Sequence, residues 1–397
     1  MIYVHVPFCR SFCTYCDFYS EIATRCGRAE DALRQETLMG KFADALAAEI
    51  QTRKDEITGV YAGGGVHTLY IGGGTPSVLP LDCFRRLLAA LEQAGVPRDF
   101  AEFTVEVNPD DIVEKGSSYV EGLRSMGVNR ISMGVQSFDD GVLKWMNRRH
   151  NAAQAVEAYR ILEASGIENI SIDLIFGLPQ VSDRLWMETL DKALNISASG
   201  RPPRHISSYQ LSVEPGSALA SLVVKGLWKE APEDLCRRQY SSLCELLSQA
   251  GYHHYEISNF AQPGFEAVHN SSYWKHIPYV GLGPGAHSFH YDAARSEILR
   301  QWNRENLDAY LAAAEDGTLE QFRDGESLDS DQFAMETVML GLRTSQGLSE
   351  PLLRENCSRQ AVERALADGN LVRQTDGTVR IPESLFFVSD RIITDLI

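Results

Sequence analysis

The sequence contains no run close to the ~18 consecutive apolar residues that a membrane-spanning helix requires. It also lacks internal repeats and low-complexity tracts. Basic residues are scarce: 37 Lys and Arg stand against 54 Asp and Glu, which gives a formal net charge of −17. A field of this sign repels a phosphate-rich partner. We therefore expect no membrane span and no nucleic-acid partner.

The apolar run at the start of the chain begins at Ile2 and leaves no room for a signal peptide. We therefore expect a cytoplasmic protein. With 397 residues, 44 % of them apolar, the chain can bury a large core and is long enough for about two to three domains.

Three of the eight cysteines lie close together, at Cys9, Cys13 and Cys16, in the spacing CxxxCxxC. A [4Fe–4S] cube is commonly held by four thiolates, so three cysteines would leave one iron open to a small molecule. A zinc knuckle, a disulfide with a spare thiol and three buried side chains are the alternatives. Structural zinc requires a further Cys or His pair, and none follows at such spacing. The triplet therefore favours an iron–sulfur cluster.

The other cysteines are scattered, which fits reduced, small buried side chains better than a disulfide framework. They are Cys26, Cys83, Cys236, Cys244 and Cys357. Cys26 stays open as a fourth cluster ligand.

Short β-rich runs alternate with segments of helical periodicity, which predicts a parallel sheet with right-handed crossovers. The runs are Tyr3–Val6, Thr68–Ile71, Phe103–Val107, Arg130–Val135, Ile170–Ile175 and Ile206–Leu211. Six such units predict an open, partial barrel. Ligands of parallel α/β proteins lie at the carboxyl ends of the strands. The unusual residues follow that rule, since each stands at or just past the end of a different strand: Cys9, Gly72-Gly73-Gly74, Glu106, Gln136 and Asp173.

Three regions are expected along the chain. Residues 1–215 form the partial barrel, and residues 216–326 form an additional α+β region that includes a histidine- and aromatic-rich stretch. Residues 327–397 form a small winged-helix-like domain with two short strands around Asp376-Gly377. Because this last segment is not basic, a packing or lid role is favoured over DNA binding. The run 63–65 is expected to be a flexible glycine loop.

The glycine run Gly72-Gly73-Gly74-Thr75-Pro76 together with the three cysteines resembles the site of radical S-adenosylmethionine enzymes. In such enzymes the ligand's amine and carboxylate chelate the open iron, and the reduced cluster cleaves the sulfonium. The resemblance implies a partial (β/α)6 barrel, a [4Fe–4S] cluster and S-adenosylmethionine.

Four further blocks are similar to those of the oxygen-independent coproporphyrinogen III oxidase family. They are Val105-Glu106-Val107-Asn108-Pro109, Gly134-Val135-Gln136-Ser137-Phe138, Asn147-Arg148 and Ile172-Asp173-Leu174-Ile175-Phe176-Gly177-Leu178-Pro179. By position, this resemblance implies that S-adenosylmethionine is contacted by Tyr3, Gly73, Gly74, Thr75, Glu106, Gln136, Arg148 and Asp173.

The residue types agree with these roles. Glu106 and Asp173 can accept hydrogen bonds from an amine and from ribose hydroxyls, and Arg148 can pair with a carboxylate. Tyr15, inside the cysteine loop, can pack on adenine. The structural alternative for each is an ordinary polar or aromatic residue at a strand end or surface.

Two departures separate this chain from the decarboxylating oxidases. Their pattern CxxxCxxCxC ends in a cysteine, where this chain has Phe18. The stretch His269-Asn270-Ser271-Ser272-Tyr273-Trp274 matches HNxxYW, which resembles the signature of heme chaperones related to that family. Imidazole is a common axial ligand of heme iron, so His269 is the candidate iron ligand and Asn270, Tyr273 and Trp274 complete the candidate heme site. A satisfied histidine in an aromatic corner is the alternative.

The resemblance thus implies a heme chaperone that binds heme and transfers it to acceptor apoproteins, including membrane-associated respiratory enzymes, and that forms a homodimer. Whether it is also an enzyme is left open. The alternatives are a coproporphyrinogen III oxidase and a radical enzyme acting on another tetrapyrrole.

Overall fold

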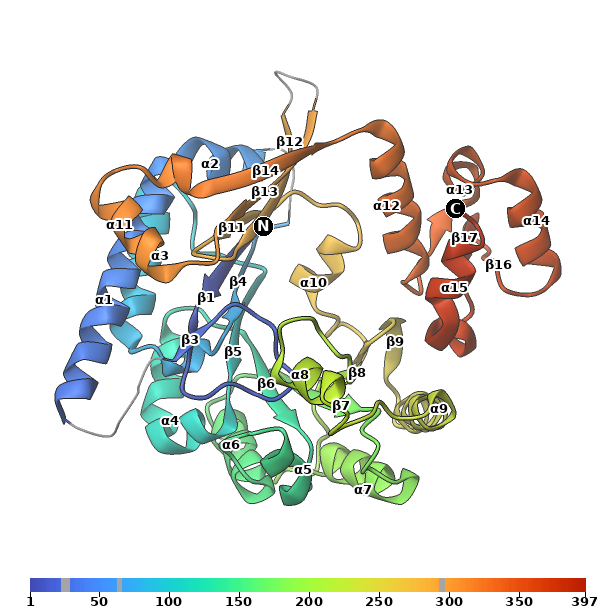
Figure 1. Ribbon diagram of the computed structural model, residues 1–397, viewed down its shortest axis with the longest axis horizontal. Helices are drawn as coiled ribbons and strands as arrows, with labels where there is room; N and C mark the ends of the chain where they lie inside the picture. The colour runs from blue at the N-terminus through green and yellow to red at the C-terminus, as the bar shows by residue number, and fades with distance from the viewer. Residues whose placement is uncertain (23–28, 63–65, 293–296) are drawn as a thin grey trace.

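The computed structural model describes residues 1–22, 29–62, 66–292 and 297–397 (Figure 1). Cys26 and the glycines at 63–65 lie outside these residues, so the expectations for them stay predictions.

One nine-stranded sheet forms the centre of the molecule, in the order β11-β1-β4-β5-β6-β7-β8-β10-β9. The six predicted runs are β1 (Ile2–Val6), β4 (Thr68–Gly73), β5 (Glu102–Val107), β6 (Arg130–Gln136), β7 (Asn169–Phe176) and β8 (His205–Gln210). They lie side by side in chain order and all pair in parallel. The predicted α/β fold with a partial barrel is confirmed.

Helices between these strands cover the outside of the sheet (Figure 1). They are α1 (Ala29–Thr52), α2 (Lys54–Ala62), α3 (Leu81–Gln93), α4 (Pro109–Ser125), α5 (Asp140–Trp145), α6 (Ala152–Ala164) and α7 (Asp183–Leu194). One face of α3 is apolar and buried, with Phe84, Leu87, Leu88 and Leu91 all within the core. Burial of this face against the strands holds the helix in place.

The region after residue 215 adds three strands to the same sheet. β9 (His253–Glu256) and β10 (Asn259–Ala261) form an antiparallel end beside β8, while β11 (Val280–Leu282) pairs in parallel with β1 at the opposite edge. The helices here are α8 (Ala218–Val224), α9 (Glu233–Gln249), α10 (Val268–Tyr273) and α11 (Leu307–Glu315). A second, antiparallel sheet contains β12 (His287–Asp292), β13 (Glu297–Asn303) and β14 (Arg323–Leu328).

The C-terminal unit has the expected mixture of helices and a small antiparallel sheet. Its helices are α12 (Ser330–Leu342), α13 (Glu350–Asn356), α14 (Arg359–Ala367) and α15 (Ser389–Thr394). Its sheet has the order β15-β17-β16, with β15 at Leu348–Ser349. β16 (Val372–Arg373) and β17 (Thr378–Arg380) flank Gly377, which has a φ of 86° that suits glycine at a tight turn. Within the described part of the chain, no helix is long and apolar enough to cross a membrane.

Candidate functional site

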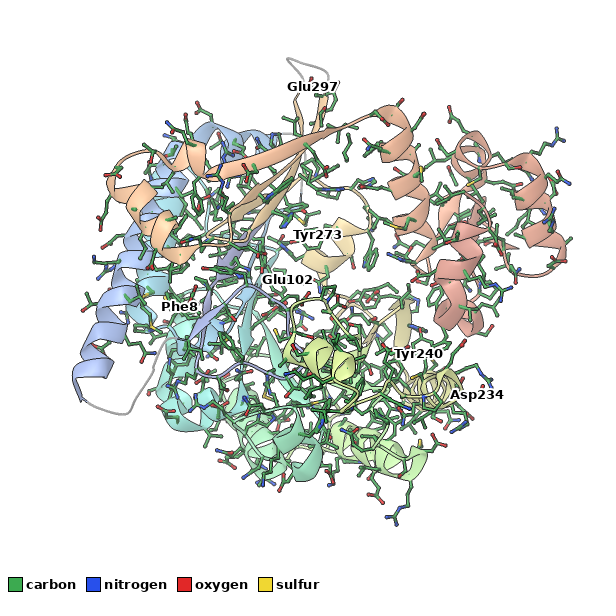
Figure 2. The ribbon with its side chains drawn as sticks, viewed as in Figure 1. Phe8, Glu102, Asp234, Tyr240, Tyr273 and Glu297 are labelled. Atoms are coloured by element: carbon green, nitrogen blue, oxygen red, sulfur yellow. The ribbon has the colours of Figure 1, made fainter. Side chains whose placement is uncertain are left out.

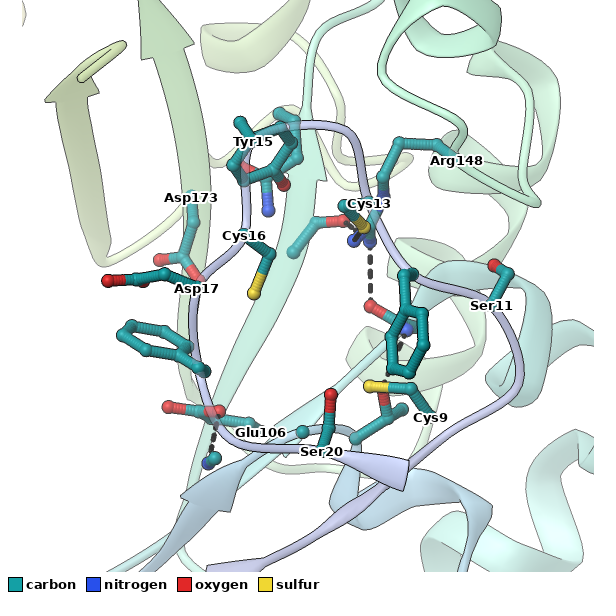
Figure 3. Close-up of a pocket in the computed structure, with 18 of the residues that line it drawn as sticks. Cys9, Ser11, Cys13, Tyr15, Cys16, Asp17, Ser20, Glu106, Arg148 and Asp173 are labelled. Carbon is teal, nitrogen blue, oxygen red and sulfur yellow. Dashed lines mark hydrogen bonds between the residues drawn. The ribbon is translucent and has the colours of Figure 1, made fainter. Parts of the chain in front are cut away.

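A cavity of about 1140 Å³ opens at the carboxyl ends of the parallel strands (Figure 3). All three cysteines of the triplet line it. So do eight of the nine residues predicted to contact S-adenosylmethionine: Tyr15, Gly73, Gly74, Thr75, Glu106, Gln136, Arg148 and Asp173. Residues from five strands and three loops therefore meet at one place, although up to 164 positions separate them in the chain.

The loop that carries the cysteines runs between β2 (Phe8–Cys9) and β3 (Glu21–Ile22) and is fastened to the segment after α5. The Thr14 N–H donates to the Met146 carbonyl at 3.0 Å, and the Asn147 side chain donates to the Phe12 carbonyl at 2.7 Å. These bonds hold the cysteines over the strand ends.

All three cysteines carry free thiols at the cavity wall. The Cys9 sulfur lies 3.4 Å from the Thr75 hydroxyl, and Arg148 Nη1 donates to the Cys13 sulfur at 3.4 Å. Burial raises the pKa of the Cys9 thiol and raises that of Cys16 to about 12. In the described ranges no three His, Cys, Asp or Glu side chains converge as the ligands of a single ion. A four-iron cluster takes one thiolate on each iron, so the donor set and its shared cavity fit such a cluster.

Neighbouring protein atoms leave no room for side chains at two positions of the glycine run. Gly73 has a φ of 104°, and a Cβ there would lie 2.7 Å from the His5 ring. A Cβ on Gly74 would lie 2.7 Å from the Phe8 carbonyl oxygen. Both contacts are too short for any side chain, so glycine is required here for the loop to reach the cavity.

Glu106 is held at the end of β5 by two donors. The Tyr70 hydroxyl donates to Oε1 at 2.7 Å, and the Gly73 N–H donates to Oε2 at 3.2 Å. Burial raises the pKa of this carboxyl to about 7, against its usual 4.5. Glu106 is therefore a carboxyl that can gain or lose a proton near neutral pH while it faces the cavity.

Asp173 and Arg148 lie on the same wall. The Ser132 hydroxyl is 3.1 Å and 3.2 Å from the two carboxylate oxygens of Asp173, and burial raises the pKa of that carboxyl. Arg148 Nη2 donates to Asn108 Oδ1 at 2.6 Å and to the Gly134 carbonyl at 2.7 Å. Its buried Nε has no partner among the described residues. A buried donor without a hydrogen-bond partner is uncommon in folded proteins.

Tyr3 differs from the other predicted residues, because it is not among the described residues that line the cavity. Its hydroxyl is hydrogen-bonded to His5 Nδ1 at 3.1 Å, and its ring lies 6.1 Å from that of Tyr70. Its predicted contact with S-adenosylmethionine therefore stays a prediction.

The HNxxYW stretch forms α10 and its C-terminal cap at Trp274 (Figure 2, where Tyr273 is labelled). His269 is 1 % exposed, and both of its ring nitrogens are engaged: Nδ1 with Thr68 Oγ1 at 2.8 Å and Nε2 with the Tyr273 hydroxyl at 2.9 Å. Burial lowers the pKa of His269 to about 3. Asn270, its neighbour, lines the cysteine cavity.

Several residues that line the cavity were not predicted from the sequence, because no motif marks them. Tyr70 and Ser132 face the cavity at strand positions that any buried residue could occupy, and Asn108 stands in a recognised block without an assigned role. The alternation of side chains along a strand could have found them, because Tyr70 is two residues before Gly72 and Ser132 two before Gly134.

Comparison with known proteins agrees with this geometry. The Radical SAM superfamily profile matches residues 3–193. The solved coproporphyrinogen III oxidase HemN of Escherichia coli has the same fold, with a TM-score of 0.77 over 99 % of this chain and 89 % of that one, at 22 % sequence identity. Residues 3–193 thus form a radical SAM domain, with the [4Fe–4S] cluster and S-adenosylmethionine of that class.

Two relatives show which family within the radical SAM class this chain belongs to. The heme chaperone HemW of Synechocystis sp. is 34 % identical over 354 residues, which are 87 % of this chain and 78 % of that protein. The heme chaperone HemW of Bacillus subtilis is 30 % identical over 390 residues, 95 % of this chain and 93 % of that protein. This chain belongs to the HemW family.

Proposed function

We propose that this protein is a heme chaperone: it binds heme and delivers it to apoproteins. Support comes from relatives named heme chaperone HemW, which match over most of both chains at 30–35 % identity. Membrane-associated respiratory enzymes as acceptors, a homodimer and a cytoplasmic location are the finer parts of the proposal.

In this proposal Cys9, Cys13 and Cys16 hold the cluster. S-adenosylmethionine occupies the rest of the same cavity, against Tyr15, Gly73, Gly74, Thr75, Glu106, Gln136, Arg148 and Asp173, with Tyr3 as the ninth predicted contact. When bound, the cluster supplies the electron for cleavage of the sulfonium. Glu106 accepts hydrogen bonds from the ligand's amine, and Arg148 offers its free Nε to a carboxylate. Tyr15, half-buried at the cavity wall, covers the adenine ring.

Heme binds at the HNxxYW stretch in this proposal, with His269 as iron ligand and Asn270, Tyr273 and Trp274 beside it. Both nitrogens of the His269 ring are engaged, so iron must displace one partner. Tyr273 is the partner that can leave, because it belongs to the same short helix, whereas Thr68 lies within the central sheet.

A heme titration tests this ligand assignment. His269→Ala should remove the spectral change on heme binding, while the controls His253→Ala and His276→Ala should keep it. Tyr273→Phe removes only the hydroxyl that competes for Nε2, and we expect it to strengthen heme binding by about ten-fold. An unchanged spectrum for His269→Ala, or weaker binding for Tyr273→Phe, would move the iron ligand elsewhere.

Oxidative decarboxylation of coproporphyrinogen III is the second candidate, because the fold is shared with HemN. Phe18 argues against it: this side chain is 65 % exposed and lines the cavity where the oxidase pattern has a cysteine. Anaerobically reconstituted protein should bind S-adenosylmethionine and yield no protoporphyrinogen from coproporphyrinogen III. Multiple turnovers in that assay would favour the oxidase function over the heme chaperone.

A further inference from the structure

The HNxxYW helix is tied directly to strand β4. The His269 ring lies over Tyr70, with ring centres 5.1 Å apart at an interplanar angle of 34°. Its Nδ1 bonds to Thr68, two residues earlier on the same face of the strand. The imidazole therefore covers two successive inward side chains of β4.

A second tie fixes the start of this helix to β5. The Glu102 carboxylate accepts hydrogen bonds from the backbone N–H groups of Val268 at 2.6 Å and of His269 at 3.2 Å. These N–H groups have no partner within the helix itself. Glu102 lies four residues before Glu106, on the same face of β5. The helix is thus fixed to the two strands that also carry Tyr70 and Glu106.

Tyr70 connects this helix to the cavity. Its ring is in contact with His269, and its hydroxyl donates to Glu106, which also accepts the Gly73 N–H. A continuous series of packed and hydrogen-bonded groups therefore runs from the HNxxYW histidine to the glycine run beside the cluster loop.

We propose that His269 is a positioning residue of the S-adenosylmethionine site: it holds the Tyr70 ring in place, so that the Tyr70 hydroxyl fixes the Glu106 carboxylate toward the ligand's amine. This role uses the same side chain that the proposed function assigns to heme iron, and it rests on the proposed contact between Glu106 and S-adenosylmethionine. The HNxxYW stretch would then have a second role, in S-adenosylmethionine binding at the cavity.

The charge on Glu106 reports the position of Tyr70, because the tyrosine hydroxyl stabilises the charged carboxylate. Burial is the larger influence and raises the pKa of Glu106, while the bond from Tyr70 lowers it. The other titratable groups that face this carboxyl come from four elements: Asp173 of β7, Arg130 of β6, Tyr3 of β1 and Tyr273 of α10. None of them changes in the variants used below.

The test is the pH dependence of S-adenosylmethionine binding to the cluster-loaded protein, measured by equilibrium dialysis between about pH 6 and 8. Affinity should rise as Glu106 loses its proton, because only the carboxylate accepts the amine's N–H groups well. Tyr70→Phe should move the midpoint of this rise to higher pH and weaken binding about ten-fold at pH 7. His269→Ala should move the midpoint in the same direction. Without the His269 ring packed against it, the Tyr70 ring is no longer held where its hydroxyl donates to Glu106.

His205→Ala is the matched control. His205 is also fully buried, and its ring bonds to one small hydroxyl and one tyrosine, Ser171 and Tyr255, each at 2.8 Å. In the described part of the chain, none of these three residues is hydrogen-bonded to Glu106, so the midpoint should stay at its wild-type pH even if stability falls. Thr68→Val, which removes only the hydroxyl that holds the His269 ring, is the alternative variant should His269→Ala fail to fold.

A wild-type midpoint for both His269→Ala and Thr68→Val, or an equal shift for His205→Ala, would overturn the inference. A wild-type midpoint for Tyr70→Phe would overturn it as well. Heme titration of the same proteins separates the two roles of His269. Loss of heme binding with an unchanged midpoint supports the ligand role alone, whereas a shifted midpoint with intact heme binding supports the positioning role alone.

Discussion

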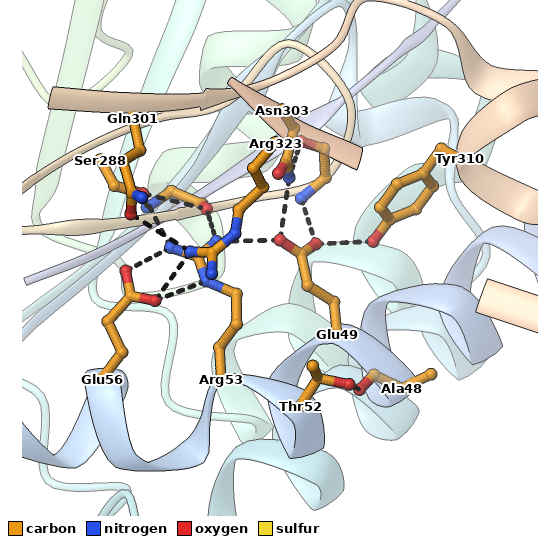
Figure 4. A network of polar contacts seen from close by, with 12 residues as sticks. Ala48, Glu49, Thr52, Arg53, Glu56, Ser288, Gln301, Asn303, Tyr310 and Arg323 are labelled. Atoms are coloured by element: carbon orange, nitrogen blue, oxygen red, sulfur yellow. Dashed lines mark hydrogen bonds and ion pairs between the residues drawn. The ribbon is translucent and has the colours of Figure 1, made fainter. Parts of the chain in front are cut away.

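Arg53 and Glu49 form an ion pair of 2.9 Å inside the protein, with side chains that are 3 % and 2 % exposed (Figure 4). Glu49 also accepts hydrogen bonds from Asn303 and Tyr310, and Arg53 donates to Ser288. These partners lie more than 200 residues further along the chain. The pair therefore fastens helix α1 to the region after the barrel.

Arg53→Met should destabilise the protein by about 3 kcal/mol or more, because it leaves the Glu49 carboxylate buried without its countercharge. Chemical unfolding followed by circular dichroism measures this loss. Arg86→Met is the control: Arg86 also pairs with two carboxylates, Asp82 at 2.8 Å and Asp44 at 3.0 Å, but on the surface. Its loss should cost no more than about 1 kcal/mol. Equal losses for the two variants would show that the buried pair does not hold α1 in place.

Much of the fold followed from local pattern. The six barrel strands were predicted within a residue or two, because apolar β-rich runs alternate with segments of helical periodicity. Strand β11 could not be predicted. Its three residues pair with β1, about 280 positions away. A segment this short forms a strand only because the free edge of β1 offers it backbone hydrogen bonds.

The sequence predicted those site residues whose side-chain chemistry itself indicates a role, such as thiols and carboxylates at strand ends. Cys9, Glu106 and Asp173 meet at one cavity because parallel strands all end at the same edge of the sheet. The surroundings of His269 were not predictable. Its two hydrogen-bond partners depend on how α10 lies against β4, and nothing in the local sequence of either element specifies that packing.

Replacement of Cys9, Cys13 or Cys16 by alanine should remove the cluster, because three thiolates are the smallest set that can hold it in the proposed site. Iron and sulfide analysis of anaerobically reconstituted protein should fall from about four of each per chain to nearly none. The double variant of Cys83 and Cys357, two free thiols outside the cavity, should keep full content. An equal loss in that control would refute the ligand assignment.

Glu256→Gln should stabilise the protein, and by more at pH 8 than at pH 5.5. Glu256 is 1 % exposed, and burial raises the pKa of its carboxyl from 4.5 to about 7. As the pH rises from 4.5 to about 7, the unfolded chain releases this proton more readily than the folded one, so the folded state loses stability over that range. Glutamine carries no charge, and its amide can donate to Asn259 Oδ1, a buried acceptor without a partner among the described residues.

The melting temperature of wild type minus that of Glu256→Gln, measured across this pH range, isolates this carboxyl from the other titrating groups. The difference should become more negative by several degrees between pH 5.5 and 8. Because Glu256 also bridges β9 to Thr344 at the end of α12, the same trend should appear in the protease sensitivity of the C-terminal unit. A difference that does not change with pH would mean that Glu256 is ionised in the folded protein throughout, with its charge compensated by Asn259 and the Ser258 N–H.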